Sequence, residues 1–243
     1  MPNAKFVQET SEKIRNSTKL NNIKYLFGSI MVFIKDALPE KVNLDSVLAR
    51  IEKTIPFELT QEVDEIFIGH FSDFYKRDIN AIYRDGAIFV TNRQSSDDDL
   101  YDDIVHEIAH AVEKQLSEVL YRDQELEAEF LGKRKRLFSL LQQTIGDKLR
   151  IDHYEKDFLN AQYSIEFDRF LYKIVGYHTL HGVSLTLFPS PYSITSLREY
   201  FAVGFEFYYI KNKAHQLKKS CPILFKKLDT IDSLCQNYSE REK

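Results

Sequence analysis

The sequence predicts an α+β protein with a small sheet in its first half and a mostly helical second half. Two short β-like runs flank an Asp-Gly pair, a long helical pattern follows them, and residues 121–175 are rich in Glu, Lys, Leu and Phe. Only eight Gly and six Pro occur in 243 residues, which favours long regular elements. The composition, 43% hydrophobic and 29% charged, is that of an ordinary globular protein of one or two domains.

The N-terminal part combines polar helical segments with one apolar run. Residues 5–25 are predicted to form a polar helix, and Tyr25–Ile34 an apolar strand or a buried helix. Residues 44–55 are predicted to form a short helix that Pro56 ends, because four apolar residues recur at helical spacing: Leu44, Val47, Leu48 and Ile51. We expect an N-terminal helical segment, residues 1–38, followed by the main domain, residues 39–243.

The pattern then changes to that of strands. Residues 63–71 contain the run Ile66-Phe67-Ile68 and are predicted to form one strand. Residues 79–83 and 87–91 are predicted to form two more, joined through Asp85-Gly86, a strong signal for a tight hairpin turn. Together these strands form the predicted small mixed sheet.

The helix predicted from about residue 98 to residue 120 carries the motif HExxH, formed by His106, Glu107 and His110. Residues four apart lie above one another on a helix, so both imidazoles can reach one cation. The apolar stripe of this helix centres more than a quarter-turn away and can face the core. The motif therefore predicts Zn²⁺ held by His106 and His110, with Glu107 deprotonating a water at the metal.

Catalytic zinc usually has three protein ligands, so a third must come from elsewhere in the chain. Two downstream acidic regions compete for this role. One contains Glu127 and Glu129, and the other contains Glu199, which lies in a predicted helix that begins near Thr195 after Pro189 and Pro191 break the chain.

The run Glu199-Tyr200-Phe201-Ala202-Val203-Gly204-Phe205 resembles the third-ligand helix of the anthrax lethal factor and Pro-Pro endopeptidase group of gluzincin-type metallopeptidases. That group has Glu followed by two aromatic residues and Ala, and a catalytic Tyr seven residues before the Glu, where this chain has Tyr192. Residues 104–113 resemble its active-site helix. Val203 stands where the family often has a second acid, and residues 121–188 look like an inserted helical element.

This resemblance implies a zincin-like catalytic domain in which His106, His110 and Glu199 bind zinc. Glu107 would be the general base, and Tyr192 would stabilise the oxyanion that forms when water attacks a peptide carbonyl. The resemblance thus favours Glu199 over Glu127 and Glu129. It also implies that an extended protein or peptide substrate pairs with strand 87–91. The expected function is that of a zinc-dependent metalloendopeptidase.

Three other features are interpreted as structural. His178 and His181 are expected to be loop histidines without a metal, because no acid or thiol accompanies them. The basic run Lys133-Arg134-Lys135-Arg136 is expected to form a solvated helix face. Cys221 and Cys235 are expected to be reduced thiols.

Composition narrows the possible partners and location. The net charge of −4 favours neither a nucleic-acid nor an acidic-membrane partner, and no apolar run is long enough to span a bilayer. Without a signal-peptide pattern at its start, the chain is expected to be cytoplasmic, or delivered without a cleaved signal. Two alternatives remain: a zincin-fold toxin, effector or binding module with little turnover, and a zinc hydrolase of a non-peptide amide.

Overall fold

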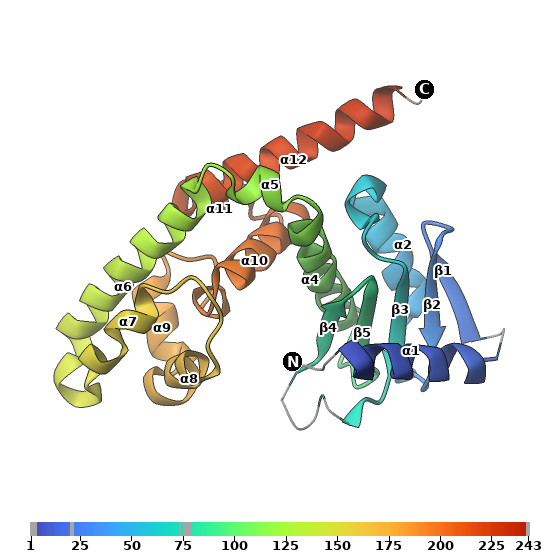
Figure 1. Ribbon diagram of the computed structural model, residues 1–243, viewed down its shortest axis with the longest axis horizontal. Coiled ribbons are helices and arrows are strands. Elements are labelled where there is room, and N and C mark those ends of the chain that lie inside the picture. Colours follow the sequence, from blue (N-terminus) through green and yellow to red (C-terminus); the bar gives the residue numbers. More distant parts are fainter. Residues whose placement is uncertain (1–3, 20–21, 73, 75–78, 242–243) are drawn as a thin grey trace. The chain divides into compact units, whose positions relative to one another are not determined.

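The computed structural model describes residues 4–19, 22–72, 74 and 79–241, and it divides into two compact units, residues 1–115 and 116–243. The first unit contains the sheet and the second is helical, which confirms the α+β class (Figure 1). The division falls after Gln115 and not at the predicted boundary near residue 38. Residues 20–21, which lie within the helix predicted over 5–25, are outside the described residues.

The sheet of the first unit has five strands in the order β1-β2-β3-β5-β4. The inner pairs, β2 with β3 and β3 with β5, are parallel, and both outer pairs are antiparallel. The strands are β1 (Ile23–Leu26), β2 (Ile30–Ile34), β3 (Glu65–Gly69), β4 (Ala81–Arg84) and β5 (Ala87–Thr91). The apolar segment at 25–34 is therefore largely a hairpin that joins this sheet.

The turn between β4 and β5 has the backbone that its sequence predicts. Asp85 and Gly86 have positive φ angles of 49° and 85°, as a two-residue turn of this kind requires. β5 pairs with β3 on one side and with β4 on the other. The prediction that an extended substrate pairs with strand 87–91 is therefore wrong, because both sides of this strand are already paired. The hairpin partner β4 is instead the last strand on this side of the described sheet.

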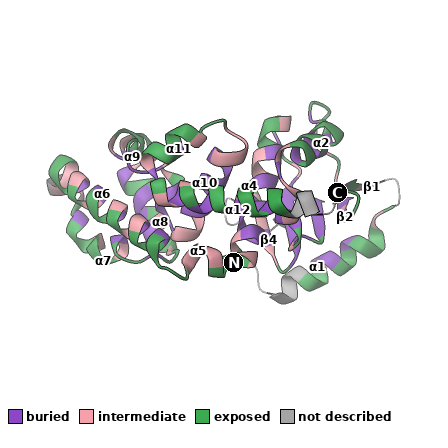
Figure 2. Ribbon diagram, turned by 90° about the horizontal axis from the view of Figure 1, so that it is seen from above, coloured by how far each residue is buried: buried purple, intermediate pink, exposed green. Residues whose placement is uncertain are grey.

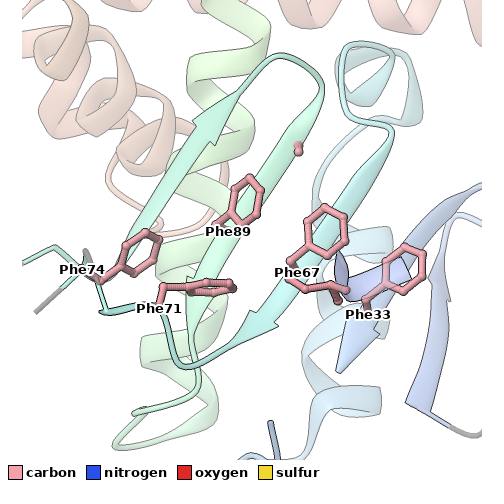
Figure 3. Packing of buried hydrophobic residues seen from close by; sticks show 7 residues of the cluster. Phe33, Phe67, Phe71, Phe74 and Phe89 are labelled. Carbon is pink, nitrogen blue, oxygen red and sulfur yellow. The ribbon is translucent and has the colours of Figure 1, made fainter. Parts of the chain in front are cut away.

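A row of phenylalanines crosses one face of the sheet. Phe33, Phe67 and Phe89 occupy matching positions on β2, β3 and β5, and their ring centroids lie 5.1 and 5.0 Å apart (Figure 3). Phe71 and Phe74 extend this cluster beyond β3. Ile14 of helix α1 (Ala4–Ser17) packs against the same cluster. α1 is also tied to the sheet by Arg15, whose guanidinium makes two bonds to the carboxylate of Glu65, at 2.7 and 2.8 Å.

The other face of the sheet carries aliphatic residues, because side chains alternate along a strand. Ile66, Ile88 and Val90 on this face are completely buried. Helix α4 (Asp97–Gln115) packs against β4 and β5, and helix α2 (Leu44–Thr54) packs against α4. The 3₁₀ helix η2 (Phe57–Thr60) also contacts α4. Helix α4 therefore covers the sheet next to β4, the last strand on this side.

The second unit consists of helices in the part of the chain that is described. Its elements are α5 (Ser117–Tyr121), α6 (Glu125–Leu149), η3 (Ile151–Tyr154), α7 (Glu155–Phe158), α8 (Ile165–Arg169), η4 (Phe170–Val175), α9 (Tyr177–Ser184), η5 (Tyr192–Ile194), α10 (Leu197–Tyr209), α11 (Ala214–Ser220) and α12 (Pro222–Arg241). Their ribbons alternate between buried and exposed residues, as amphipathic helices do (Figure 2). Residues 121–188, interpreted from the sequence as an inserted helical element, belong to this unit.

Helix α10 lies at the centre of this unit. All of its residues from Tyr200 to Phe207 are buried, and Gly204 lies so close to α12 that an added Cβ would be 2.4 Å from a methyl carbon of Leu224. The ring of Tyr200 contacts those of Phe130 on α6 and Phe188, with centroids 5.4 and 5.8 Å away. α10 is therefore held between α6 and α12.

Replacing the central ring of the phenylalanine row tests this description of the first unit. Phe67→Ala should lower the free energy of unfolding by roughly 3–5 kcal/mol, because Phe67 is fully buried and its removal leaves a cavity. Phe57→Ala is the matched control, since Phe57 is 45% exposed, and it should cost less than about 1 kcal/mol. Urea denaturation followed by circular dichroism measures both values, and equal losses would contradict the packing.

Candidate metal centre

Helix α4 begins at a strong capping sequence. The Ser96 hydroxyl accepts a hydrogen bond from the Asp99 N–H at 3.2 Å, and the Asp99 carboxylate accepts one from the Ser95 N–H at 3.1 Å. Asp97, Asp98 and Asp99 place negative charge in the first turn, where the helix dipole favours it. Further along the helix, Ile104, Val105, Ile108, Ala109 and Val112 are all completely buried, so this side of α4 faces the core.

The opposite side of α4 brings the motif residues together. One ligand atom from each of His106, Glu107 and His110 lies within 4.8 Å of the others. The two imidazole rings are perpendicular, with centroids 4.9 Å apart. His110 and Glu107 are buried, with 5% and 6% exposure, and His106 is partly buried. This is the only cluster of potential metal-binding side chains found among the described residues.

Glu107 is held at the edge of the sheet. Its carboxylate accepts a hydrogen bond from the backbone N–H of Tyr83 on β4. Because the Thr91 N–H donates to the Asn80 carbonyl, alternation along the hairpin turns the polar groups of Ala81 and Tyr83 away from β5. Glu107 thus contacts the backbone row that β4 presents at its outer edge.

Two further side chains extend the polar stripe of α4 on either side of the motif. The Glu113 carboxylate lies 3.7 Å from Nδ1 of His110, so Nε2 is the nitrogen that would be available to a metal. The Gln94 amide donates to Asp103 at 2.9 Å and to the Thr91 carbonyl at 3.1 Å, which links α4 to the end of β5. Asp103 precedes His106 by three residues and Glu113 follows His110 by three, so helical spacing would have found both.

Asp103, in this polar stripe, has a pKa that departs clearly from its ordinary value. The pKa of Asp103 is raised to about 6, mainly by burial and also by the Glu107 charge, while the Gln94 hydrogen bond and His106 oppose the rise. The folded protein without metal therefore favours the protonated form of Asp103 over the range between its ordinary pKa and about pH 6.

The donor set fits zinc. Imidazole and carboxylate groups are common zinc ligands. Ligand atoms about 2.0–2.1 Å from a tetrahedral zinc ion lie roughly 3.4 Å from one another. The motif atoms lie within 4.8 Å of one another, so rotation about the side-chain bonds would have to bring the two imidazoles to that spacing. His106 and His110 would hold the ion, with Glu107 beside it.

The other two residues predicted for the site lie in the second unit. Tyr192 opens η5 and is 40% exposed. Glu199 lies in the first turn of α10, where its N–H donates to the capping Ser196 hydroxyl at 3.2 Å. Glu199 is partly buried and lies near Asp168, whose pKa it helps to raise, although burial is the larger cause. That Tyr192 and Glu199 join the histidine pair stays a prediction from the resemblance.

The contacts of the alternative ligand Glu129 favour a structural role. One carboxylate oxygen accepts hydrogen bonds from the Tyr200 hydroxyl at 2.8 Å and the Leu224 N–H at 3.2 Å, and the other accepts one from the Ile223 N–H at 2.9 Å. Glu129 therefore caps the start of α12, and this capping argues against a role as ligand. Glu127 is exposed in the first turn of α6.

The features interpreted as structural have mixed outcomes. His178 and His181 lie on α9, not in a loop, and both are exposed. Cys221 and Cys235 are both buried, and neither forms a disulfide in the described part of the chain. Within the basic run, Lys135 and Arg136 are exposed as expected, but Arg134 is completely buried, so the expectation of a solvated face is wrong for that residue.

Comparisons with protein-family models, curated proteins and solved structures found no match. Function is therefore inferred from the motif geometry and from the resemblance in the sequence. Within the described ranges, no helix has the length and apolarity needed to cross a membrane.

The raised pKa of Asp103 predicts a pH-dependent stability change in the metal-free protein. Because the fold favours the protonated acid, the charged form destabilises it by up to about 3 kcal/mol above pH 6, and this cost vanishes near pH 4. Asp103→Asn should therefore raise the free energy of unfolding at pH 7.5 and change it little at pH 4.

Urea denaturation of chelator-treated protein at the two pH values measures this difference. Asp98→Asn is the control on the same helix, because the Asp98 side chain is 77% exposed, and it should change stability by less than about 1 kcal/mol. An Asp103→Asn effect of the same size at both pH values would count against the buried charge.

Proposed function

We propose that this protein is a zinc-dependent metalloendopeptidase, similar in its motifs to the lethal factor and Pro-Pro endopeptidase group. The observation that carries the proposal is the convergence of His106, Glu107 and His110 on the polar side of α4. A second observation supports it: Glu107 contacts the outer edge of β4, where an extended peptide can pair.

Each residue has a defined role in this proposal. His106 and His110 hold zinc, which when bound lowers the pKa of a water to about 7 and polarises a carbonyl. Glu107 accepts the proton of the attacking water and passes it to the leaving amine. The resemblance assigns the third ligand to Glu199 and gives Tyr192 the hydrogen bond to the oxyanion.

We place the proposed peptide-binding strand at β4, because β5 is paired on both sides. The backbone groups of Ala81 and Tyr83 point away from β5, so an extended chain added beside β4 can bond to them. The Tyr83 N–H donates to Glu107 in the free protein. A peptide that takes this N–H would release the Glu107 carboxylate for proton transfer at the bond beside it.

Removing the general base should separate metal binding from cleavage. Glu107→Gln keeps the size of the side chain, so it should retain about one zinc per chain and lose at least roughly 100-fold in cleavage rate. A mixed-sequence peptide library read by mass spectrometry measures cleavage, and Glu118→Gln, on an exposed position of α5, is the control. Unchanged cleavage by Glu107→Gln would refute the proposed mechanism.

The parent protein tests the alternative functions. If it binds stoichiometric zinc but cleaves no peptide, a module with little turnover or a non-peptide hydrolase is favoured.

The third ligand is tested by comparing Glu199→Gln with Glu129→Gln. If Glu199 binds the metal, Glu199→Gln should weaken the zinc dissociation constant at least about 100-fold, because a direct ligand is lost. Glu129→Gln should leave that constant within about threefold and lower the melting temperature, because it weakens the α12 cap. Competition with a chromophoric chelator measures both constants. The reverse pattern would assign the ligand to Glu129.

A further inference from the structure

Arg134 is a fully buried charge in the second unit. It lies on α6 with no exposed surface, although Lys135 and Arg136 beside it are exposed. A lone guanidinium is costly to bury, because it loses its water shell. Its hydrogen bonds must therefore replace those to water, and the groups that accept them indicate the role of the side chain.

Every hydrogen-bond acceptor recorded for Arg134 is a backbone carbonyl. Nε donates to Ile194 at 2.8 Å, and Nη2 donates to the Ile194 and Thr195 carbonyls at 2.5 and 2.8 Å. Nη1 donates to Asp157 at 3.1 Å and to Asn160. These bonds match the five N–H groups of a guanidinium, so the donors of the buried group are satisfied.

The surroundings also stabilise the positive charge. The rings of Phe130 and Phe167 lie 4.7 and 4.6 Å from the guanidinium carbon. Burial lowers the pKa of Arg134 to about 9, so the group keeps its charge at neutral pH. The carbonyls belong to the ends of α7 and η5, where helical turns leave C=O groups without partners.

The segment that Arg134 holds connects the two proposed site residues of this unit. Tyr192 begins η5, Ile194 ends it, and Thr195 and the capping Ser196 lead directly into the turn of α10 that carries Glu199. Weaker bonds brace the same stretch: the Thr195 hydroxyl donates to the Tyr192 carbonyl at 2.9 Å. The Leu197 N–H donates to the Ala161 carbonyl, also at 2.9 Å.

We propose that Arg134 is a positioning residue that fixes the segment from Tyr192 to Glu199 and so sets these two side chains for the zinc chemistry. The proposal rests on the proposed function, in which Tyr192 and Glu199 serve the metal site. Arg134 acts from inside the core and through backbone carbonyls alone. Its planar fork spans the ends of η5 and α7 at once, which the single ammonium of lysine cannot do.

Arg134→Lys, compared with Arg136→Lys, tests the proposal on the full-length chain. The first change keeps a positive charge and removes the fork, and the second makes the same replacement at an exposed position of the same helix. Arg134→Lys should speed hydrogen exchange at least about tenfold in the amides of residues 194–199, with α12 unchanged. It should also weaken the zinc dissociation constant about tenfold and alter the visible absorption of the Co²⁺-substituted protein, which reports ligand geometry. Arg136→Lys should change none of these.

A milder variant covers the outcome in which Arg134→Lys does not fold. Thr195→Val removes only the hydroxyl bond to the Tyr192 carbonyl and keeps the side-chain shape. It should move exchange, zinc affinity and the Co²⁺ spectrum in the same direction by a smaller factor.

The outcomes separate this proposal from the proposed function. Parent protein that binds neither Zn²⁺ nor Co²⁺ overturns the metal site, and the exchange data then decide alone whether Arg134 fixes the segment. If the parent binds the metal normally, and hydrogen exchange and the Co²⁺ spectrum are unchanged in Arg134→Lys, the positioning role is overturned. A uniform rise in exchange throughout residues 116–243 also overturns it, since that pattern shows support of the core only.

Discussion

The burial of one side of α4 against the sheet is the constraint on which the candidate metal centre depends. Ile104, Val105, Ile108, Ala109 and Val112 on this side are completely buried, and the β4–β5 hairpin and α2 pack against the helix. The phase of the helix is thereby set, so the histidines four residues apart must share the other side. The same packing places Glu107 within hydrogen-bonding distance of the β4 backbone. One packed helix thus brings together the proposed metal ligands, the proposed base and the outer edge of β4.

The second unit uses buried polar side chains for a different purpose, namely to hold the ends of helices. Glu129 caps α12 with both carboxylate oxygens. Arg134 donates hydrogen bonds to carbonyls at the ends of α7 and η5. In each case a charged group on the long helix α6 satisfies backbone groups from segments far away in the sequence. α10, with Glu199 in its first turn, is held between these supports.

Local patterns account for what the sequence predicted correctly. Helix spacing found α2 and α4, and the Asp85-Gly86 pair found the hairpin, because these signals depend on neighbouring residues. Strand order depends on pairing between distant segments, so the sequence did not show that β5 also pairs with β3 and is therefore not an edge strand. Arg134 was misread for a similar reason: its neighbours are exposed charges, and only the fold brings four distant carbonyls around it. Asp103 and Glu113 lie at helical spacing from the histidines, and that signal was present but unused.

X-ray absorption at the zinc edge, on protein purified without chelator, tests the central claim most directly. The account predicts about one zinc per chain, with nitrogen and oxygen ligands at about 2.0–2.1 Å and the scattering pattern of two imidazoles. His110→Ala should remove one imidazole from that pattern. Protein without stoichiometric zinc, or zinc with sulfur ligands at about 2.3 Å, would contradict the account.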